Sequence, residues 1–184
     1  MATVDCLFAL LIPESVVRRG SKPRAFCIAL TVTLLATLTA CGSDAPAEAT
    51  ACGAFVIENL DPLSVQHVLP GADVTYLTSP PTSGPHVGGA APSGALDEPL
   101  DETVQVSVLE GGRTLVQYQP TLPASEIDEL RSLGGLRIVV APNPELAAPV
   151  IATRWRAKLT CARASAAELE AFSLNPDLPA TEAD

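Results

Sequence analysis

Polar and apolar residues alternate between Thr103 and Leu109, which would place three valines on one face of an extended segment. An alternation of period two predicts a β-strand. The following Glu110-Gly111-Gly112-Arg113 has the residues of a turn, and Thr114–Tyr118 would form the returning strand. We therefore expect a β-hairpin at the centre of the chain.

Four further elements follow in the pattern. Ser125 would cap a helix that runs to about Leu133 with Ile127 and Leu130 turned inward, because apolar residues three or four apart share one helix face. The apolar run Leu136–Ala141, stopped by prolines, predicts a buried strand. Val150–Cys161 predicts one long strand, and Ser165 would open a last helix with Glu168 in its first turn.

Within Val150–Cys161, alternation divides the side chains between two faces. One face would hold Thr153, Trp155, Ala157, Leu159 and Cys161, which places Cys161 toward the core. The other would carry a basic stripe of Arg154, Arg156 and Lys158. This stripe is either a solvated face paired with the acidic residues at 97–102, or a site for an anion or a partner protein.

The order of the elements is ββαββα, which predicts an α+β fold with a mainly antiparallel sheet of about four strands covered on one face by two helices. A long loop rich in proline and glycine, residues 79–99, precedes these elements. The single α+β domain is expected to span residues 52–174, and residues 175–184 are expected to form a loose tail.

The beginning of the chain has the pattern of an export signal. Ala25–Ala40 is an uncharged apolar run that follows four basic residues, and it is short for a transmembrane helix. It ends in Leu38-Thr39-Ala40-Cys41, the lipobox pattern of bacterial lipoproteins. We predict a signal peptide over 1–40, palmitate-type lipidation of Cys41 and a flexible tether over 41–51. The mature protein would then be secreted and lipid-anchored at the cell envelope, on the outer side of the cell membrane or in an outer membrane.

Charge narrows the range of partners. The chain has 11 basic and 21 acidic residues; without the four and two in the predicted leader, 7 and 19 remain, a net charge of −12. A domain this acidic repels nucleic acid and anionic lipid headgroups. We expect no nucleic-acid partner, and membrane attachment through the lipid alone.

Two of the five cysteines remain after the leader and the lipidated residue are set aside, namely Cys52 and Cys161. In an oxidising compartment such a pair favours a disulfide. Two free buried thiols are the alternative. A thiolate metal site is less favoured, because residues so far apart lack metal-ligand spacing.

Several segments resemble an uncharacterised bacterial family, catalogued as domain of unknown function 3105. The resemblance is carried above all by Pro80-Pro81-Thr82-Ser83-Gly84-Pro85-His86. It extends to 67–71, Val74, Tyr76, 98–100, 106–112, 116–118, 140–142, Ala152, Thr153 and Trp155. Members are typically secreted or membrane-anchored. The resemblance implies no activity, because none is established for the family.

The chain departs from the family at a segment that usually resembles V-H-x-L-E-H-G. Here Ser107 and Gly111 stand in the two histidine positions, while Glu110 remains. His86, His67 and Glu110 could supply two nitrogens and one oxygen to Zn or Cu, if they converge. If these residues bind no metal, His86 is a structural histidine that bonds the backbone of its stiff loop. His67 is then a surface or satisfied histidine, and Glu110 is a solvated side chain at a turn.

The sequence contains no phosphate-binding loop, dinucleotide fingerprint, G-x-S-x-G or H-E-x-x-H motif. A non-catalytic binding or interaction module, with another envelope protein as a candidate partner, is therefore the favoured hypothesis. A metal-binding protein that uses Zn or Cu is the alternative, and an unrecognised hydrolase or redox enzyme is the third.

Overall fold

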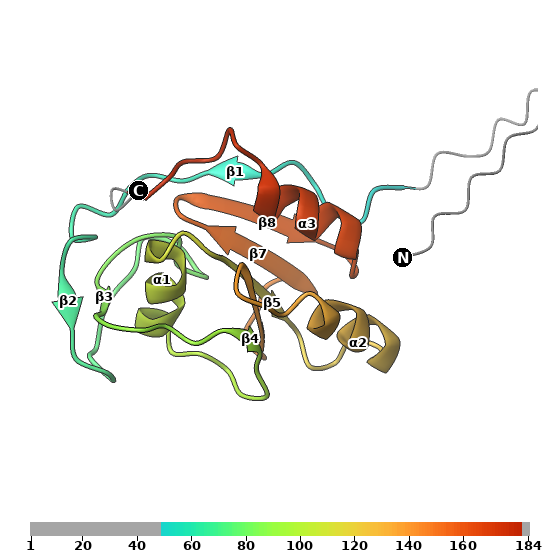
Figure 1. Ribbon diagram of the computed structural model, residues 1–184, viewed down its shortest axis with the longest axis horizontal. Helices are drawn as coiled ribbons and strands as arrows, with labels where there is room; N and C mark the ends of the chain where they lie inside the picture. The colour runs from blue at the N-terminus through green and yellow to red at the C-terminus, as the bar shows by residue number, and fades with distance from the viewer. Residues whose placement is uncertain (1–48, 182–184) are drawn as a thin grey trace, which may run out of the picture. The chain divides into compact units, whose positions relative to one another are not determined.

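The computed structural model describes residues 49–181 (Figure 1). The predicted signal peptide, the lipidation site Cys41 and most of the tether lie outside the described residues. The elements in chain order are β1 (Val56–Ile57), β2 (His67–Val68), β3 (His86–Val87), β4 (Gly94–Ala95), α1 (Glu102–Glu110), β5 (Thr114–Tyr118), α2 (Ala124–Ser132), β6 (Ile138–Pro142), β7 (Val150–Arg154), β8 (Ala157–Cys161) and α3 (Ala166–Leu174). No helix among them is long and apolar enough to cross a bilayer.

The α+β class is confirmed, but the predicted strand count and order are wrong. The main sheet has six strands in the order β1-β8-β7-β5-β6-β4, and β2 and β3 form a separate two-stranded sheet. The pairs β1–β8, β8–β7 and β7–β5 are antiparallel, while the pairs β5–β6 and β6–β4 are parallel. The main sheet is therefore mixed. Four of the missed strands have two residues each, too few to show a periodic pattern.

Both faces of the main sheet are covered, whereas the sequence predicted helices on one face only. Leu130 of α2 and Leu169 and Phe172 of α3 pack on the face formed by Val116 and its neighbours. The second face packs against α1 through Val106, Val108 and Leu109. Burial on both sides explains why β5 and β6 are buried at every position.

The strand predicted over Thr103–Leu109 is a helix, α1. Its residues are buried almost all round, polar and apolar alike, so its apolar positions do not show the helical period. Ser107 Oγ donates to the carbonyl oxygens of Thr103 and Val87 at 2.9 and 2.7 Å, which ties α1 to β3. Tertiary packing here overrides the preference of valine for strands.

The long strand predicted over Val150–Cys161 is two strands joined by a turn at Trp155 and Arg156, the latter with φ of 56°. In the resulting antiparallel register Thr153 lies opposite Lys158 and Arg154 lies opposite Ala157. Paired residues share a face, so Arg154 and Lys158 are on opposite faces and the predicted basic stripe does not exist. The inward position of Cys161 is confirmed, at 1% exposure.

The helices α2 and α3 are found where they were predicted, and Leu130, Leu169 and Phe172 are buried. Ser165 is the N-cap position of α3, as predicted, whereas α2 begins at Ala124 after Pro123 and not at a Ser125 cap; neither helix has a side-chain N-cap bond. The end predicted as a loose tail contributes Leu178 to the core.

Cys52 and Cys161 form the predicted disulfide, which joins residues 109 positions apart. Backbone bonds flank it, from Gly53 N to the Thr160 oxygen at 3.0 Å and from Ala162 N to the Ala51 oxygen at 2.8 Å. The Glu168 carboxylate accepts the N–H groups of Ala51 and Cys52 at 2.8 and 3.0 Å. These bonds and the interaction with Arg163 lower the pKa of Glu168, although desolvation acts in the opposite direction.

Candidate functional site

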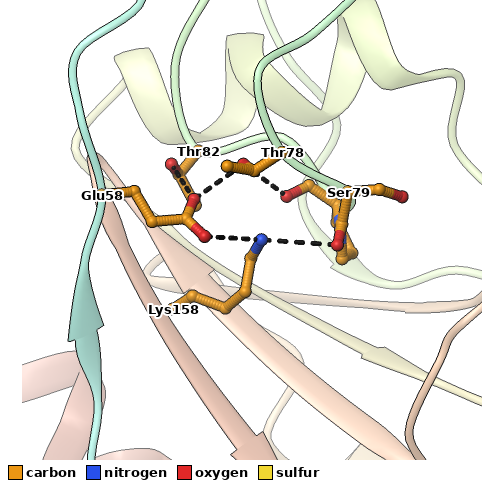
Figure 2. A network of polar contacts seen from close by, with 6 residues as sticks. Glu58, Thr78, Ser79, Thr82 and Lys158 are labelled. Carbon is orange, nitrogen blue, oxygen red and sulfur yellow. Dashed lines mark hydrogen bonds and ion pairs between the residues drawn. The ribbon is translucent and has the colours of Figure 1, made fainter.

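The heptapeptide Pro80–His86 is buried along its whole length. A polar network around Glu58 holds its first half (Figure 2). Thr82 and Thr78 donate to one carboxylate oxygen of Glu58 at 2.6 and 2.7 Å, and Lys158 Nζ lies 2.9 Å from the other. Lys158 also donates to the Ser79 carbonyl oxygen at 3.4 Å. The loop is thus fixed to β8 through a nearly buried ion pair.

Burial raises the pKa of Glu58, but the bonds from Thr82, Lys158 and Thr78 together outweigh it, so the pKa lies below its ordinary value. The anion is therefore the form built into the network. Arg156 adds two contacts with the backbone of the same region. Its backbone N–H donates to the Thr82 carbonyl oxygen at 2.9 Å, and its side-chain Nε donates to the Glu58 carbonyl oxygen at 3.2 Å.

The second half of the heptapeptide is held by Asp61 and Tyr76. Ser83 Oγ accepts the N–H of Asp61 at 2.9 Å, and the Tyr76 hydroxyl donates to the Pro85 oxygen at 2.6 Å. Gly84 has φ of 132°, and a Cβ there would lie 2.8 Å from the Tyr76 ring and 3.3 Å from Asp61 Oδ2. Only glycine satisfies both the backbone angle and the space.

The two histidines, 19 positions apart in sequence, lie side by side. β2 and β3 pair in parallel with His67 opposite His86, and the His86 N–H donates to the Gln66 oxygen at 3.0 Å. The ring centroids are 4.9 Å apart in an edge-to-face arrangement. His67 is exposed, whereas His86 is 3% exposed.

The buried imidazole of His86 has one nitrogen bonded and one nitrogen free. Nδ1 lies 3.1 Å from the Gly84 carbonyl oxygen, which can only accept, so Nδ1 carries the proton. In the neutral imidazole Nε2 is then the acceptor nitrogen, and it has no hydrogen-bond partner in the structure. A buried acceptor in this state costs about 1 to 3 kcal/mol. Such groups are rare in native proteins and call for an explanation.

Both histidines line a cavity of about 220 Å³, which we call the histidine pocket. The pocket also brings in Glu110 from the end of α1, so all three residues predicted as metal ligands border one space. The remaining lining residues are Leu60, Asp61, Pro62, Ser64, Val65, Trp155 and Thr181. Within residues 49–181, however, no three His, Cys, Asp or Glu side chains are grouped closely enough to hold a metal ion.

The basic residues predicted as a partner face do not line the pocket, and their contacts are within the protein. Arg154 donates to the Asn175 oxygen at 2.9 Å, while Arg156 and Lys158 bind the Glu58 region. The carboxylate paired with Lys158 is that of Glu58 and not one of the acidic group at 97–102.

Sequence reasoning missed Asp61, Trp155 and Thr181 as pocket residues. Trp155 had been assigned to the face of Ala157, but the turn at 155–156 places it in the core on the α1 side. Thr181 lies in the segment predicted as a tail. Asp61 precedes the resembling region and carries no local signal.

These features define the class: a small disulfide-closed α+β domain with a mixed sheet and a pocket lined by a buried histidine whose Nε2 has no hydrogen-bond partner in the structure. The chain belongs to the family described as protein of unknown function DUF3105, whose sequence profile matches residues 67–181. The match begins and ends at residues of the histidine pocket. Neither the curated proteins nor the solved structures contain a significant match to the chain.

Ser107 and Gly111, which we expect to replace two histidines of the family pattern, lie in the C-terminal half of α1 and directly after it. Ser107 bonds the Val87 oxygen, next to His86, and Gly111 follows the pocket residue Glu110 as the C-cap of the helix.

Proposed function

We propose that the mature chain is a non-catalytic binding module, lipid-anchored at the cell envelope, whose ligand occupies the histidine pocket. The observation that carries the proposal is His86 Nε2, a buried lone pair with no protein partner in a residue that lines a cavity. A ligand that donates a hydrogen bond to this atom, or a Lewis acid that accepts its electrons, would supply the missing partner.

The loop supports this proposal because it holds the acceptor in place before any ligand arrives. Its hydroxyl groups are already used: Thr82 donates to Glu58 and Ser83 accepts from Asp61. Neither is placed as a nucleophile with a free base beside it. A rigid, preorganised acceptor lowers the entropic cost of binding.

A metal ion is the second candidate, and one observation favours it. A metal-bound histidine usually donates a hydrogen bond from its other ring nitrogen to a carbonyl or carboxylate oxygen, as His86 Nδ1 does to the Gly84 carbonyl oxygen. His67 stands beside it as a second imidazole. Zn or Cu held by these two would need further ligands from water or a bound molecule, because the described residues offer no third side chain in range.

NMR of ¹⁵N-histidine-labelled protein tests the protonation and ligation of His86. Because the chain has only two histidines, one variant is enough to assign the imidazole signals. The full chain, purified in detergent, would be compared as isolated and after unfolding, dialysis and refolding. We expect an unprotonated Nε2 signal of His86 in the stripped protein and a shifted one as isolated. His67→Ala identifies the remaining signal.

The outcomes separate the candidates. ZnCl₂ or CuCl₂ that changes both imidazole signals supports a metal site. A shift of His86 restored only by the organic fraction released on unfolding supports an organic ligand. A protonated Nε2, or a signal that is identical in the isolated, stripped and metal-treated samples, overturns the proposal.

The envelope location has its own test. Cells expressing the full chain and fed labelled palmitate should label the wild type and Cys27→Ala, but not Cys41→Ala. Equal labelling of Cys41→Ala would remove the lipid anchor from the proposal.

A further inference from the structure

A second cavity of about 640 Å³ lies apart from the two histidines, and its charge is of one sign. Asp73, Asp101, Glu102 and Glu145 line it, and within the described range no Lys, Arg or His does. We call this cavity the acidic cleft. Its carboxylates come from three places in the chain: the loop after β2, the start of α1 and the loop between β6 and β7.

The cleft carboxylates are not used by the fold. In the described part of the chain the ion pairs are Arg131–Asp97 and Lys158–Glu58, neither of which involves the cleft. Asp101 is the N-cap of α1 but makes no side-chain cap bond. The cleft therefore contains uncompensated negative charge, in a protein that has basic side chains available elsewhere.

Two buried polar atoms give a second and independent indication of a ligand. Gln105 and Thr103 line the cleft with 3% and 4% exposure, and neither Gln105 Oε1 nor Thr103 Oγ1 has a hydrogen-bond partner. The amide end of Gln105 is fixed, because its Nε2 donates to the Leu100 oxygen at 2.8 Å. Its oxygen is thus a positioned acceptor.

We infer that the acidic cleft binds a small aliphatic polyamine. The N–H groups of an ammonium ion would bond Gln105 Oε1 and Thr103 Oγ1, and further ammonium groups along the ligand would pair with Glu102 and Glu145. The Tyr76 ring and Leu146 also line the cleft and suit the methylene segments and a cation–π contact. The volume falls within the range of small-molecule sites, roughly 300 to 1,000 Å³.

The electrostatics of the lining agree with this assignment. The pKa of Tyr76 is raised to about 12, first by burial and then by Glu102 and Asp61. The pKa of Glu102 is raised by burial and by the neighbouring Glu145 carboxylate. A cation between these groups would relieve their mutual repulsion. The volume is far larger than a metal ion requires, and these carboxylates are not grouped as a metal-ligand set.

Isothermal titration of the full chain in detergent with spermidine, at 150 mM NaCl, tests the inference. We expect one saturable site. Affinity should fall about tenfold or more in Glu102→Gln/Glu145→Gln, because charge-assisted hydrogen bonds are lost. Glu170→Gln is the matched control: it removes one exposed charge on α3, which is outside the cleft, and should leave affinity unchanged.

Thr103→Val examines the buried hydroxyl separately. The side chains have nearly the same shape and the hydroxyl has no partner, so the fold should be as stable as wild type while spermidine binds several-fold more weakly. Absence of binding to wild type, equal weakening in Glu170→Gln, or stoichiometric competition by CaCl₂ or by an oligolysine peptide in preference to spermidine would each overturn the assignment. His86→Ala should bind spermidine with wild-type affinity. The test of the acidic cleft is therefore independent of whether the histidine pocket binds a ligand.

Discussion

The ion pair between Lys158 and Glu58 provides a quantitative test of how the heptapeptide Pro80–His86 is held in place. In Lys158→Met the Glu58 carboxylate loses its counter-ion but keeps the Thr78 and Thr82 hydroxyls. Removing one partner of a fully buried pair costs about 3 to 5 kcal/mol. The side chains here are 13% and 14% exposed and two hydrogen bonds remain, so we expect a loss of about 2 to 3 kcal/mol.

The assay is urea unfolding of the full chain with its disulfide intact, followed by circular dichroism at pH 7. Arg137→Met is the control, because Arg137 is exposed and its loss also removes one positive charge. That control should lie within about 0.5 kcal/mol of wild type. In a double-mutant cycle, Glu58→Gln should recover part of the loss when combined with Lys158→Met.

Acid unfolding gives the same pair a second signature. The pKa of Glu58 is lowered in the folded protein from 4.5, so its stabilising contribution is present above pH 4.5 and is lost as the pH falls through the folded-state pKa. In Lys158→Met burial remains while two lowering interactions disappear, so the loss should begin at higher pH. If Lys158→Met were no less stable than Arg137→Met, and their acid transitions coincided, the network would not hold the loop as we argue.

Three further predictions concern other residues that stabilise the fold. Gly84→Ala should destabilise the fold by about 2 kcal/mol or more, because the new methyl group meets the Tyr76 ring in a backbone conformation that disfavours L side chains; urea unfolding measures it, and a wild-type midpoint would contradict it. The Cys52→Ala/Cys161→Ala variant should lose about 4 to 5 kcal/mol in the chain-entropy model, and dithiothreitol should lower the unfolding midpoint of the wild type but not that of the variant. Glu168→Gln should flatten the loss of stability below pH 4.5, because the lowered pKa of the native carboxylate makes its contribution fade on acidification; identical wild-type and variant midpoints from pH 6 to pH 3 would refute this.

The sequence predicted the elements whose inward side chains keep a regular spacing. β5, β6, α2 and α3 were found, and the count of cysteines left after the predicted leader and lipidation site predicted the correct disulfide. The helix α1 was missed because it is buried on nearly all sides, so three alternating valines imitated a strand. The turn at 155–156 was missed because Trp155-Arg156 lacks the Gly, Asn or Asp that usually marks a two-residue hairpin.

The site was predictable as residue types but not as a place. His67, His86 and Glu110 were selected by chemistry, and the contact between the two imidazoles depends on a parallel pairing of two dipeptides that no periodicity reveals. The acidic cleft was invisible for a similar reason. Its carboxylates belong to loops and a helix start up to 72 positions apart, from Asp73 to Glu145, and only the fold brings them together.

The disulfide has a mechanical consequence. A pulling force applied to the chain before Cys52 passes through the sulfur atoms directly into the end of β8, and the weakly paired β1 is bypassed. Everything between Cys52 and Cys161 is then enclosed in a covalent ring that the force cannot extend, and both candidate pockets are built almost entirely from residues of that ring. With the lipid anchor that we propose, a force that pulls on the N-terminal end would therefore leave both candidate pockets unloaded.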